Sequence, residues 1–245
     1  MLRSLYIAAS GMLAQRKTMD VITNNLANME TVGFRRDTLM SQSFSDVLIG
    51  RINDPAYDSA GIGRLNFGIH ADEIVTGFEQ GPLEPTDRAA DLALQGDGFF
   101  VVETPQGLRF TRAGNFQVDA QGYLCTSEGY YVRGANGRIA VGSQDFAVDS
   151  TGVIQSDAGT FRLQLVQFAD NSVLRKVGEN LFSGPLTAQN ATCSVRQGFL
   201  EGSNVDLSQE MVNMITMQRN YQSNQTMISM INGTLEKAVN EIGRL

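Results

Sequence analysis

Apolar residues recur at seven-residue intervals at both ends of this 245-residue chain, and that repeat constrains the fold more than any other feature. Near the C-terminus, one seam consists of Leu207, Met214, Tyr221, Ile228, Leu235 and Ile242; three residues further along each heptad, a second consists of Met217, Ile231, Ala238 and Leu245, with Asn224 as its polar break. Near the N-terminus, the same spacing gives Leu5, Met12, Met19 and Leu26, flanked by Ala8, Ile22 and Met29. A heptad stripe is typical of a helix surface that packs against another helix. We therefore predict a helix at each end, pairing with the other and with the ends of neighbouring copies.

These helices are not expected to be stable alone. Most helical stability in proteins comes from packing an apolar face rather than from intrinsic propensity. A stripe without a partner lacks that contribution, while the entropy cost of ordering the backbone remains. Both ends of the chain therefore need partners.

Composition and charge exclude several classes of protein. With 42% hydrophobic residues, the chain can bury the core of one or two domains. Its net charge of −7 argues against a nucleic-acid-binding protein, which needs a basic surface to meet phosphates. No apolar run approaches the roughly 18 residues of a membrane span, and Arg16, Lys17 and Asp20 interrupt any conventional signal peptide. Cys125 and Cys193 are far apart in the sequence and predict buried free thiols rather than a disulfide framework.

The middle of the chain has a different pattern. All five prolines lie there, at Pro55, Pro82, Pro85, Pro105 and Pro185. From residue 68 to about 202, short apolar runs such as 99–102 alternate with turn residues, which is typical of an antiparallel all-β domain. Between about residues 44 and 68 the periodicity is weak, which indicates a linker or an irregular extended segment.

The predicted fold class is therefore α+β, with a discontinuous, coiled-coil-like helical domain formed by both termini and a central all-β domain. The expected boundaries are 1–36 for the N-terminal helix and the loop that follows it, and 37–68 for the linker or extended segment. Residues 69–202 are expected to form the central β domain. Residues 203–245 are expected to form the C-terminal heptad helix, which pairs with 1–36.

No arrangement of residues points to catalysis, a cofactor or a metal. The single histidine, His70, has Asp72 and Glu73 beside it but no cysteine nearby, a pattern typical of a surface or satisfied core residue. Residues 96–98, Gly-Asp-Gly, run into Phe99 rather than into a helix start, so they indicate a turn before a strand and not a dinucleotide-binding loop. We predict that the protein is not an enzyme and that it uses no cofactor and no metal ion.

Three runs resemble one known family. Residues 24–36, NNLANMETVGFRR, resemble the signature of flagellar basal-body rod and hook proteins. Asn25 and Asn28 can satisfy backbone groups exposed where a helix ends, and Gly33 permits a sharp turn. The other matching positions are Asn24, Leu26, Ala27, Thr31 and Phe34. Residues 91–124, DLALQGDGFFVVETPQGLRFTRAGNFQVDAQGYL, resemble the β domain of the rod subunits, and residues 198–224, GFLEGSNVDLSQEMVNMITMQRNYQSN, resemble their C-terminal helix.

The resemblance implies a structural subunit of the bacterial flagellar basal-body rod. Such subunits polymerise helically into a hollow shaft that transmits torque and lets export substrates pass. The implied partners are the chain itself, other rod and hook subunits, and the flagellar type III export apparatus, with no nucleic acid and no lipid-spanning segment. The implied location is the basal body, reached without a cleaved signal peptide. Phe44 and Leu48 resemble the short hydrophobic motif that these subunits present to the export gate, although an apolar pair beside a helix end is an equal explanation.

The size of the chain, and the complete GDGFFVV and EGSNVDL runs, favour one of the larger rod subunits, proximal or distal, with the distal type preferred. A hook-type subunit of the same family is an alternative. From another class, a coiled-coil oligomer that presents a β-rich binding head, like an adhesin, also fits the pattern. Such a protein would form a closed oligomer of fixed number, whereas a rod subunit would stay monomeric until it meets its template.

A polar stripe follows another face of the C-terminal helix. Its members are Gln218, Gln222, Gln225, Ser229 and Asn232, spaced by four and three residues, with no charge until Glu236. Solvated helix faces usually mix Lys and Glu, although chance also explains this run. If the C-terminal helices line a channel, these uncharged amides would form a wet surface that holds neither apolar nor charged segments in transit.

The first prediction concerns order in the free chain. Because the stripes cannot stabilise themselves, backbone amides of residues 1–36 and 203–245 should exchange quickly in a dilute monomer, while those of the β domain are protected. Hydrogen exchange read by mass spectrometry measures this. Protected termini in a monomer that sedimentation shows to be free of oligomers would contradict folding coupled to assembly.

Overall fold

A computed structural model describes residues 2–50, 61–143, 145–178, 180–185, 189–191 and 193–243. The chain divides into two compact units. The helical unit contains residues 1–26, 37–75 and 207–245, and the β unit contains residues 27–36 and 76–206. Helices from both termini and a central set of sheets confirm the predicted α+β class.

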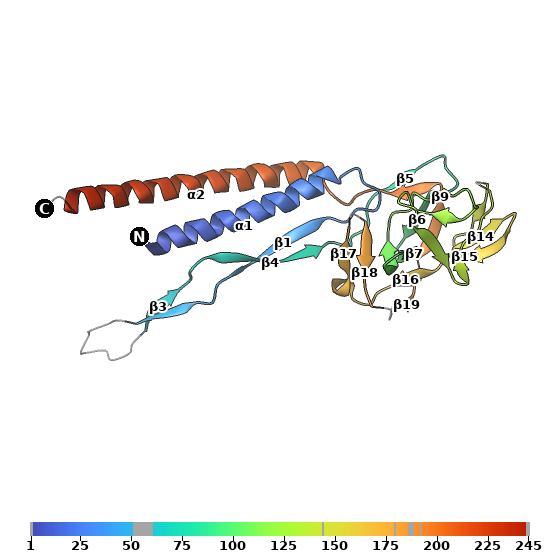
Figure 1. The fold of residues 1–245 in the computed structure, drawn as a ribbon, viewed down its shortest axis with the longest axis horizontal. Helices are drawn as coiled ribbons and strands as arrows, with labels where there is room; N and C mark the ends of the chain where they lie inside the picture. Colours follow the sequence, from blue (N-terminus) through green and yellow to red (C-terminus); the bar gives the residue numbers. More distant parts are fainter. Residues whose placement is uncertain are drawn as a thin grey trace. The chain divides into compact units, whose positions relative to one another are not determined.

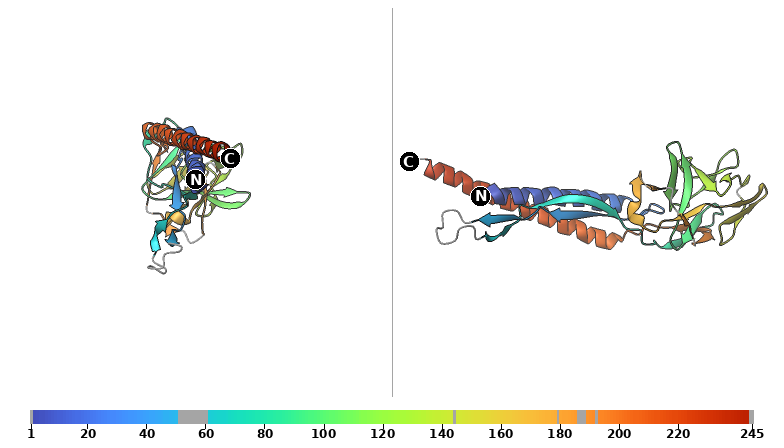
Figure 2. Two further views of the ribbon diagram at one scale, coloured as in Figure 1. Left: turned by 90° about the vertical axis from the view of Figure 1, so that its left-hand side faces the viewer. Right: turned by 90° about the horizontal axis from the view of Figure 1, so that it is seen from below.

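Two antiparallel helices form the long axis of the helical unit, α1 (Leu2–Ala27) and α2 (Leu207–Ile242). They lie side by side in both Figure 1 and Figure 2. The amide Nδ2 of Asn224 on α2 donates a hydrogen bond of 3.1 Å to Oε1 of Gln15 on α1. Among the described helices, none combines the length and the apolar character needed to cross a membrane.

A two-stranded ribbon completes the helical unit. Strand β1 (Asp37–Ser43) pairs with β4 (Ile69–Thr76), and β2 (Val47–Gly50) pairs with β3 (Gly61–Leu65). The ribbon approaches α1 at Gly68, whose φ is +124° and whose missing Cβ would lie 2.2 Å from Oγ of Ser10. A side chain at residue 68 would therefore push the ribbon off the helix.

Residues 37–68 were expected to be a linker or an irregular extended segment, but they contain the strands β1, β2 and β3. In β1, Asp37 is buried and Leu39 is half-buried, while the other side chains are exposed. A strand without a continuous buried face lacks the period-2 apolar pattern by which strands are recognised. That is why the ribbon does not stand out in the sequence.

The described part of the β unit contains one sheet of ten strands and smaller sheets, and neighbouring strands in them run antiparallel. The large sheet consists of β7 (Phe99–Thr104), β8 (Gly107–Thr111), β9 (Gln117–Val118), β10 (Leu124–Cys125), β11 (Tyr131–Gly134), β12 (Gly137–Arg138), β16 (Leu165–Gln167), β17 (Arg175–Val177), β18 (Leu181–Ser183) and β19 (Gln189–Asn190). The smaller sheets pair β5 (Leu83–Pro85) with β21 (Phe199–Glu201), pair β6 (Leu92–Gln95) with β20 (Ser194–Gln197), and join β13 (Ala147–Val148), β14 (Val153–Ser156) and β15 (Gly159–Arg162). A short 3₁₀ helix spans Asn171–Val173.

Strand β7 separates two hydrophobic cores. Phe100 and Val102 belong to one cluster, and Phe99 and Val101 belong to the other. Successive side chains of a strand point to opposite faces, so four consecutive buried residues require packing on both faces of the sheet. The run Phe-Phe-Val-Val, which lacks polar alternation, is the sequence of such a central strand.

The limits of the β unit differ from those expected from the sequence. Residues 27–36 were expected to belong with the N-terminal helix, but they pack within the β unit. Residues 69–75, expected in the β domain, belong to the ribbon of the helical unit. Protection from hydrogen exchange in the free monomer is therefore expected at residues 27–36 and from about residue 76 onward, rather than from residue 69 onward.

Candidate functional site

The heptad positions of α2 form its most covered side. The side chains at eight consecutive seam positions are half-buried: Met214, Met217, Tyr221, Asn224, Ile228, Ile231, Leu235 and Ala238. Between Met214 and Ala238, every other position is exposed except Gly233. Leu207, at the start of the seam, is 40% exposed. The side chains of Ile242 and Leu245 lie outside the described residues.

The seam of α1 is covered more completely. Ala8 and Ile22 are buried, and the remaining seam members are half-buried, namely Leu5, Met12, Met19, Leu26 and Met29. Among the α1 residues that belong to the helical unit, Ala14 and Asn25 are also buried. This helix has α2 and the ribbon beside it, which explains the deeper burial.

Asn224 is the polar break of the seam, and it meets a polar partner. Besides its hydrogen bond to Gln15, its Nδ2 lies 3.4 Å from the position that a Cβ would take at Gly11. A single polar residue inside a helix seam fixes the register of the pair, because any shift leaves the amide opposite apolar side chains. Asn224 is therefore suited to hold α1 and α2 in one alignment.

Large apolar side chains remain exposed on both helices. On α2 they are Met211, Val212, Ile215, Met227, Met230 and Val239, each at least half exposed. On α1 they are Tyr6, Ile7 and Leu13. Exposed apolar surface that recurs along an element marks an interaction surface in a soluble chain. The pairing of α1 with α2 therefore leaves further faces for other chains.

The polar stripe lies on a face of α2 next to the seam. All five members are exposed: Gln218, Gln222, Gln225, Ser229 and Asn232. The structure thus places the stripe on a free face of α2.

Within the signature run 24–36, Asn25 makes two side-chain hydrogen bonds to the backbone of Asp37. Its Nδ2 donates to the carbonyl of Asp37 at 2.8 Å, and its Oδ1 accepts from the backbone N–H of Asp37 at 3.0 Å. The buried amide therefore replaces a strand partner at the start of β1 and ties that strand to α1. The neighbouring Asn24 is exposed.

The rest of the signature forms a turn in the β unit. Thr31 donates from its backbone N–H to the carbonyl of Asn28 and from its hydroxyl to Oδ1 of Asn28, both at 3.2 Å. Gly33 has a φ of +68°, and a Cβ there would lie 2.5 Å from the backbone N of Ala113. Its N–H donates to the carbonyl of Glu201 at 2.7 Å. Glycine is required here by both conformation and space. The preceding Ala27 is exposed.

Phe34 and Arg35 anchor this turn in the β unit. Phe34 is 1% exposed, and the Lys176 ammonium lies 3.8 Å from its ring centroid. The same ammonium donates to the carbonyl of Arg35 at 3.1 Å. The Arg35 guanidinium is fully buried and forms an ion pair of 2.6 Å with Glu201. The turn is thus held by both packing and charge.

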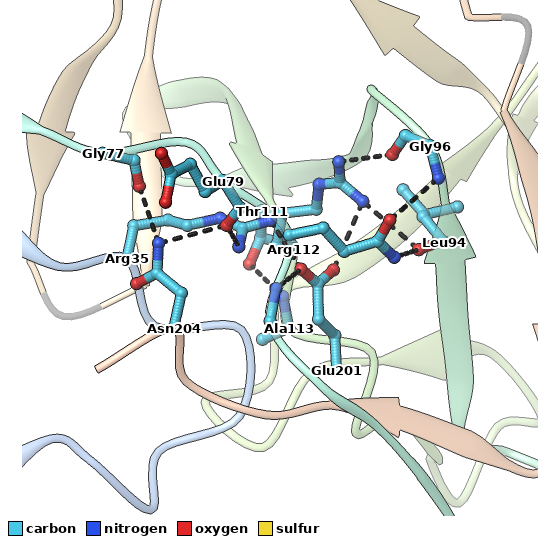
Figure 3. Close-up of polar contacts among 12 residues, drawn as sticks. Arg35, Gly77, Glu79, Leu94, Gly96, Thr111, Arg112, Ala113, Glu201 and Asn204 are labelled. Atoms are coloured by element: carbon cyan, nitrogen blue, oxygen red, sulfur yellow. Dashed lines mark hydrogen bonds and ion pairs between the residues drawn. The ribbon is translucent and has the colours of Figure 1, made fainter. Parts of the chain in front are cut away.

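Glu201 lies between two buried arginines (Figure 3). Its Oε1 pairs with Arg35 and its Oε2 with Arg112, at 2.6 and 3.2 Å. Backbone carbonyls accept further guanidinium hydrogens, those of Glu79 from Arg35 and those of Leu94 and Gly96 from Arg112. The Nε atom of each arginine is buried without a hydrogen-bond partner. Burial lowers the pKa of Arg112, an effect that the Glu201 charge opposes. We call Arg35, Arg112 and Glu201 the buried triad.

A second link joins the same segments of the β unit. Asn204 Oδ1 accepts from the backbone N–H of Arg36 at 2.7 Å, and its Nδ2 donates to the carbonyls of Gly77 and Glu79, each at 3.1 Å. The residues just after α1 and just before α2 are therefore fixed beside each other. The sequence pattern does not single out Arg112, Glu201 or Asn204. For the triad, the available signal is a charged residue beside glycine and aromatic residues, in GFRR, FTRAG and GFLEG.

Phe44, half of the possible export motif, is folded into the helical unit. Its ring is half-buried, with the centroid 5.0 Å from that of His70. Its backbone N–H donates to Gly68, and its carbonyl accepts from Asn66. The side chain of Leu48, in β2, lies outside the described residues.

The described residues include no group of three or more His, Cys, Asp or Glu side chains that could hold a metal ion. Cys125 and Cys193 are free thiols, and burial raises the pKa of both. A raised pKa lowers the thiolate fraction and with it nucleophilic reactivity. These cysteines are therefore suited to packing.

Three family models match the chain in succession. "Flagella basal body rod protein" matches residues 5–35, "Flagellar hook protein FlgE/F/G D1 domain" matches residues 93–156, and "Flagellar basal body rod FlgEFG protein C-terminal" matches residues 196–241. The first covers most of α1 and the turn after it. The last covers the β20–β21 region and nearly all of α2.

Individual relatives match along nearly the whole chain. The flagellar basal-body rod protein FlgG of Bacillus subtilis (strain 168) is 36% identical over 266 aligned residues, covering 98% of this chain and 99% of that protein. FlgG of Caulobacter vibrioides is 32% identical, covering 93% of this chain and 95% of that protein. The flagellar hook-basal body complex protein FlhO of Bacillus subtilis is 29% identical over the full length of both chains.

The fold and the site define a structural subunit whose terminal helices present packing faces and whose β unit holds their ends together. The chain belongs to the flagellar basal-body rod protein family. It is a structural rod subunit and not an enzyme, as predicted.

The second prediction concerns the buried triad. Glu201→Gln leaves Arg35 and Arg112 buried without a counter-charge and should lower the free energy of unfolding of the β unit by about 3–5 kcal/mol. Urea denaturation of the full-length chain measures this. Glu84→Gln is the matched control, because Glu84 is exposed on β5 opposite Leu200 and should change stability by no more than about 0.5 kcal/mol. Equal effects of the two changes would contradict a structural role for the triad.

Proposed function

We propose that this rod subunit is of the distal type and polymerises helically into a hollow shaft. In the shaft, the α1 and α2 helices form an inner tube and the β units an outer layer, and the assembly transmits torque. The observation that carries the proposal is the set of large apolar side chains left exposed on α1 and α2 after these helices have paired. Identical copies bury such faces through heterologous contacts, which generate open helical polymers when they do not close into a ring.

Family membership argues against the adhesin-like alternative, since the relatives of this chain are named as flagellar rod and hook-basal body proteins. It leaves other rod and hook subunits as partners at the two ends of the shaft. The complete GDGFFVV run, residues 96–102, supports the distal assignment through its resemblance to the rod subunits. In the structure, its last four residues are the buried first part of β7.

The family assignment also supports a proposal for the export route. We propose that the chain passes unfolded through the flagellar type III apparatus, and that the export gate recognises Phe44 and Leu48. The folded contacts of Phe44 with His70, Asn66 and Gly68 favour recognition before folding, because the ring is then still exposed. On arrival, the terminal helices become ordered against neighbouring copies.

The polar stripe of α2 is proposed to line the channel. It is exposed, it lies beside the seam that faces α1, and none of its five side chains carries a charge. A passing unfolded chain meets neither apolar side chains nor fixed charges there. Met227 and Met230, on the opposite flank of α2, remain for contacts with other copies.

The third prediction tests assembly through the seam. Ile228→Asp places a charge in a helix contact, costs several kcal/mol and should abolish rods and motility while the β unit stays folded. Ile228→Leu keeps the apolar contact and should retain both. Counting rods in isolated basal bodies, with hydrogen exchange of the purified chains, gives the answer. Normal rods with Asp at residue 228 would mean that the seam does not support the shaft.

The fourth prediction tests the channel. Changing Gln222 and Gln225 together to Leu should allow the rod to assemble but slow the export of later subunits, giving short or missing filaments. Changing both residues to Asn keeps the amides and should leave the filaments normal. Filament length on cells carrying each double change is the measurement. Normal filaments with the Leu pair would remove the channel-lining role and leave the rod function intact.

A further inference from the structure

A cluster of arginine and tyrosine side chains lies on one face of the large sheet in the β unit. Tyr131 is directly opposite Glu103 on β7, and Arg133 is directly opposite Arg138 on β12. Because Tyr131 and Arg133 flank the buried Val132 on β11, their side chains point away from the core that contains Val132. Tyr123 contacts Tyr131 edge to face, with 5.8 Å between the ring centroids. We call Glu103, Tyr123, Tyr131, Arg133 and Arg138 the Arg–Tyr patch.

Arg138 is held in one position although it is exposed. Its Nε and Nη2 donate to the two carboxylate oxygens of Glu103 at 3.2 and 2.9 Å. Its guanidinium carbon lies 4.3 Å from the ring centroid of Tyr131. Yet 46% of its side chain is accessible to solvent. A fixed arginine loses less conformational entropy on binding than a free one, so this side chain is pre-organised for a partner.

The composition of the patch is typical of the centre of a protein interface. Tyrosine and arginine are enriched there, and they contribute a large share of measured binding energies. Arg138 is already paired with Glu103, and the exposed Glu128 lines the same hollow as these two residues, so Arg133 is the arginine left to meet a partner's charge. A partner with exposed carboxylates is therefore favoured, and a second copy of this chain has them.

An acidic hollow lies elsewhere in the β unit. It has a volume of about 530 Å³ and lies beside β13 and at the turn between β14 and β15. Its lining residues are Ala89, Asp145, Phe146, Ala147, Gln155, Ser156 and Asp157. Asp145 and Asp157 are exposed, while Phe146 is largely buried. The two exposed carboxylates complement the arginine charges of the Arg–Tyr patch.

We propose that the Arg–Tyr patch of one copy docks into the acidic hollow of a second copy and forms a contact between β units in the shaft. The proposal rests on the proposed rod function, which brings copies of the chain together. Two different surfaces are joined, so the contact is heterologous and can propagate along a polymer. In this contact, Arg133 and Arg138 meet Asp145 and Asp157.

A charge exchange tests this pairing, and it is the fifth prediction. Arg133→Glu reverses one charge of the patch, and Asp157→Arg reverses one charge of the hollow. Each full-length variant is expressed as the sole copy in cells. Either single change should reduce the number of complete rods by about tenfold or more, since every contact in the polymer then opposes like charges. The two changes together should restore at least half of the rods.

Purified variants are melted in parallel to show that the β unit is folded. Should Arg133→Glu prevent folding, Arg133→Ala and Asp157→Ala replace the exchange, and the double change should cost no more rods than either single change. Single variants that assemble like the parent would overturn the pairing. So would a charge-exchanged chain that stays folded without forming rods, additive losses in the alanine pair, or a closed dimer of the parent in sedimentation.

The experiment distinguishes failure of the proposed contact from failure of the proposed rod function. If the unchanged chain restores rods to cells lacking their own copy while the charge reversals have no effect, the proposed contact fails and the rod function stands. If the unchanged chain restores no rods, the proposed function fails first.

Discussion

The ion pairs of the Glu201 carboxylate are the interactions that hold together the segments of the β unit that follow α1 and precede α2. Glu201 joins Arg35, in the turn after α1, to Arg112, in the segment that follows β8, and it lies on β21 six residues before α2 begins. A buried ion pair adds little net stability over apolar packing, but a pair missing one partner is strongly destabilising. The triad therefore selects a single arrangement of these segments and penalises every alternative.

The helical unit is constructed in a different way. Its seam side chains are only half-buried, and large apolar residues remain exposed on other faces of both helices. A monomer with such surfaces is incomplete, whereas the β unit has two closed cores on either side of β7. The same chain thus combines a part that is finished on folding with a part that needs other copies.

The heptad periodicity of apolar residues predicted both helices, because each helix covers the side that carries these residues. Met214, Tyr221 and Ile228 recur at the heptad spacing and are the covered positions of α2. The ribbon was not predicted, because it lacks a continuous buried face and therefore lacks alternation. The buried triad was not predicted either, since Glu201 lies 89 and 166 residues from its partners and no local pattern records such pairs. The resemblance of the signature run indicated that residues 24–36 matter, while the structure supplies the contacts of Asn25, Gly33 and Arg35.

The link between Arg36 and Asn204 has a consequence for the order in which the chain folds. Gln15 and Asn224, which meet between α1 and α2, are 209 residues apart in the sequence. Closing a flexible loop of that length costs about 4–5 kcal/mol in chain entropy. Once the β unit has folded, the backbone N–H of Arg36 lies 2.7 Å from the Asn204 side chain, and the loop between the two helices is already closed. The pairing of α1 with α2 then requires no further closure of the long loop between them.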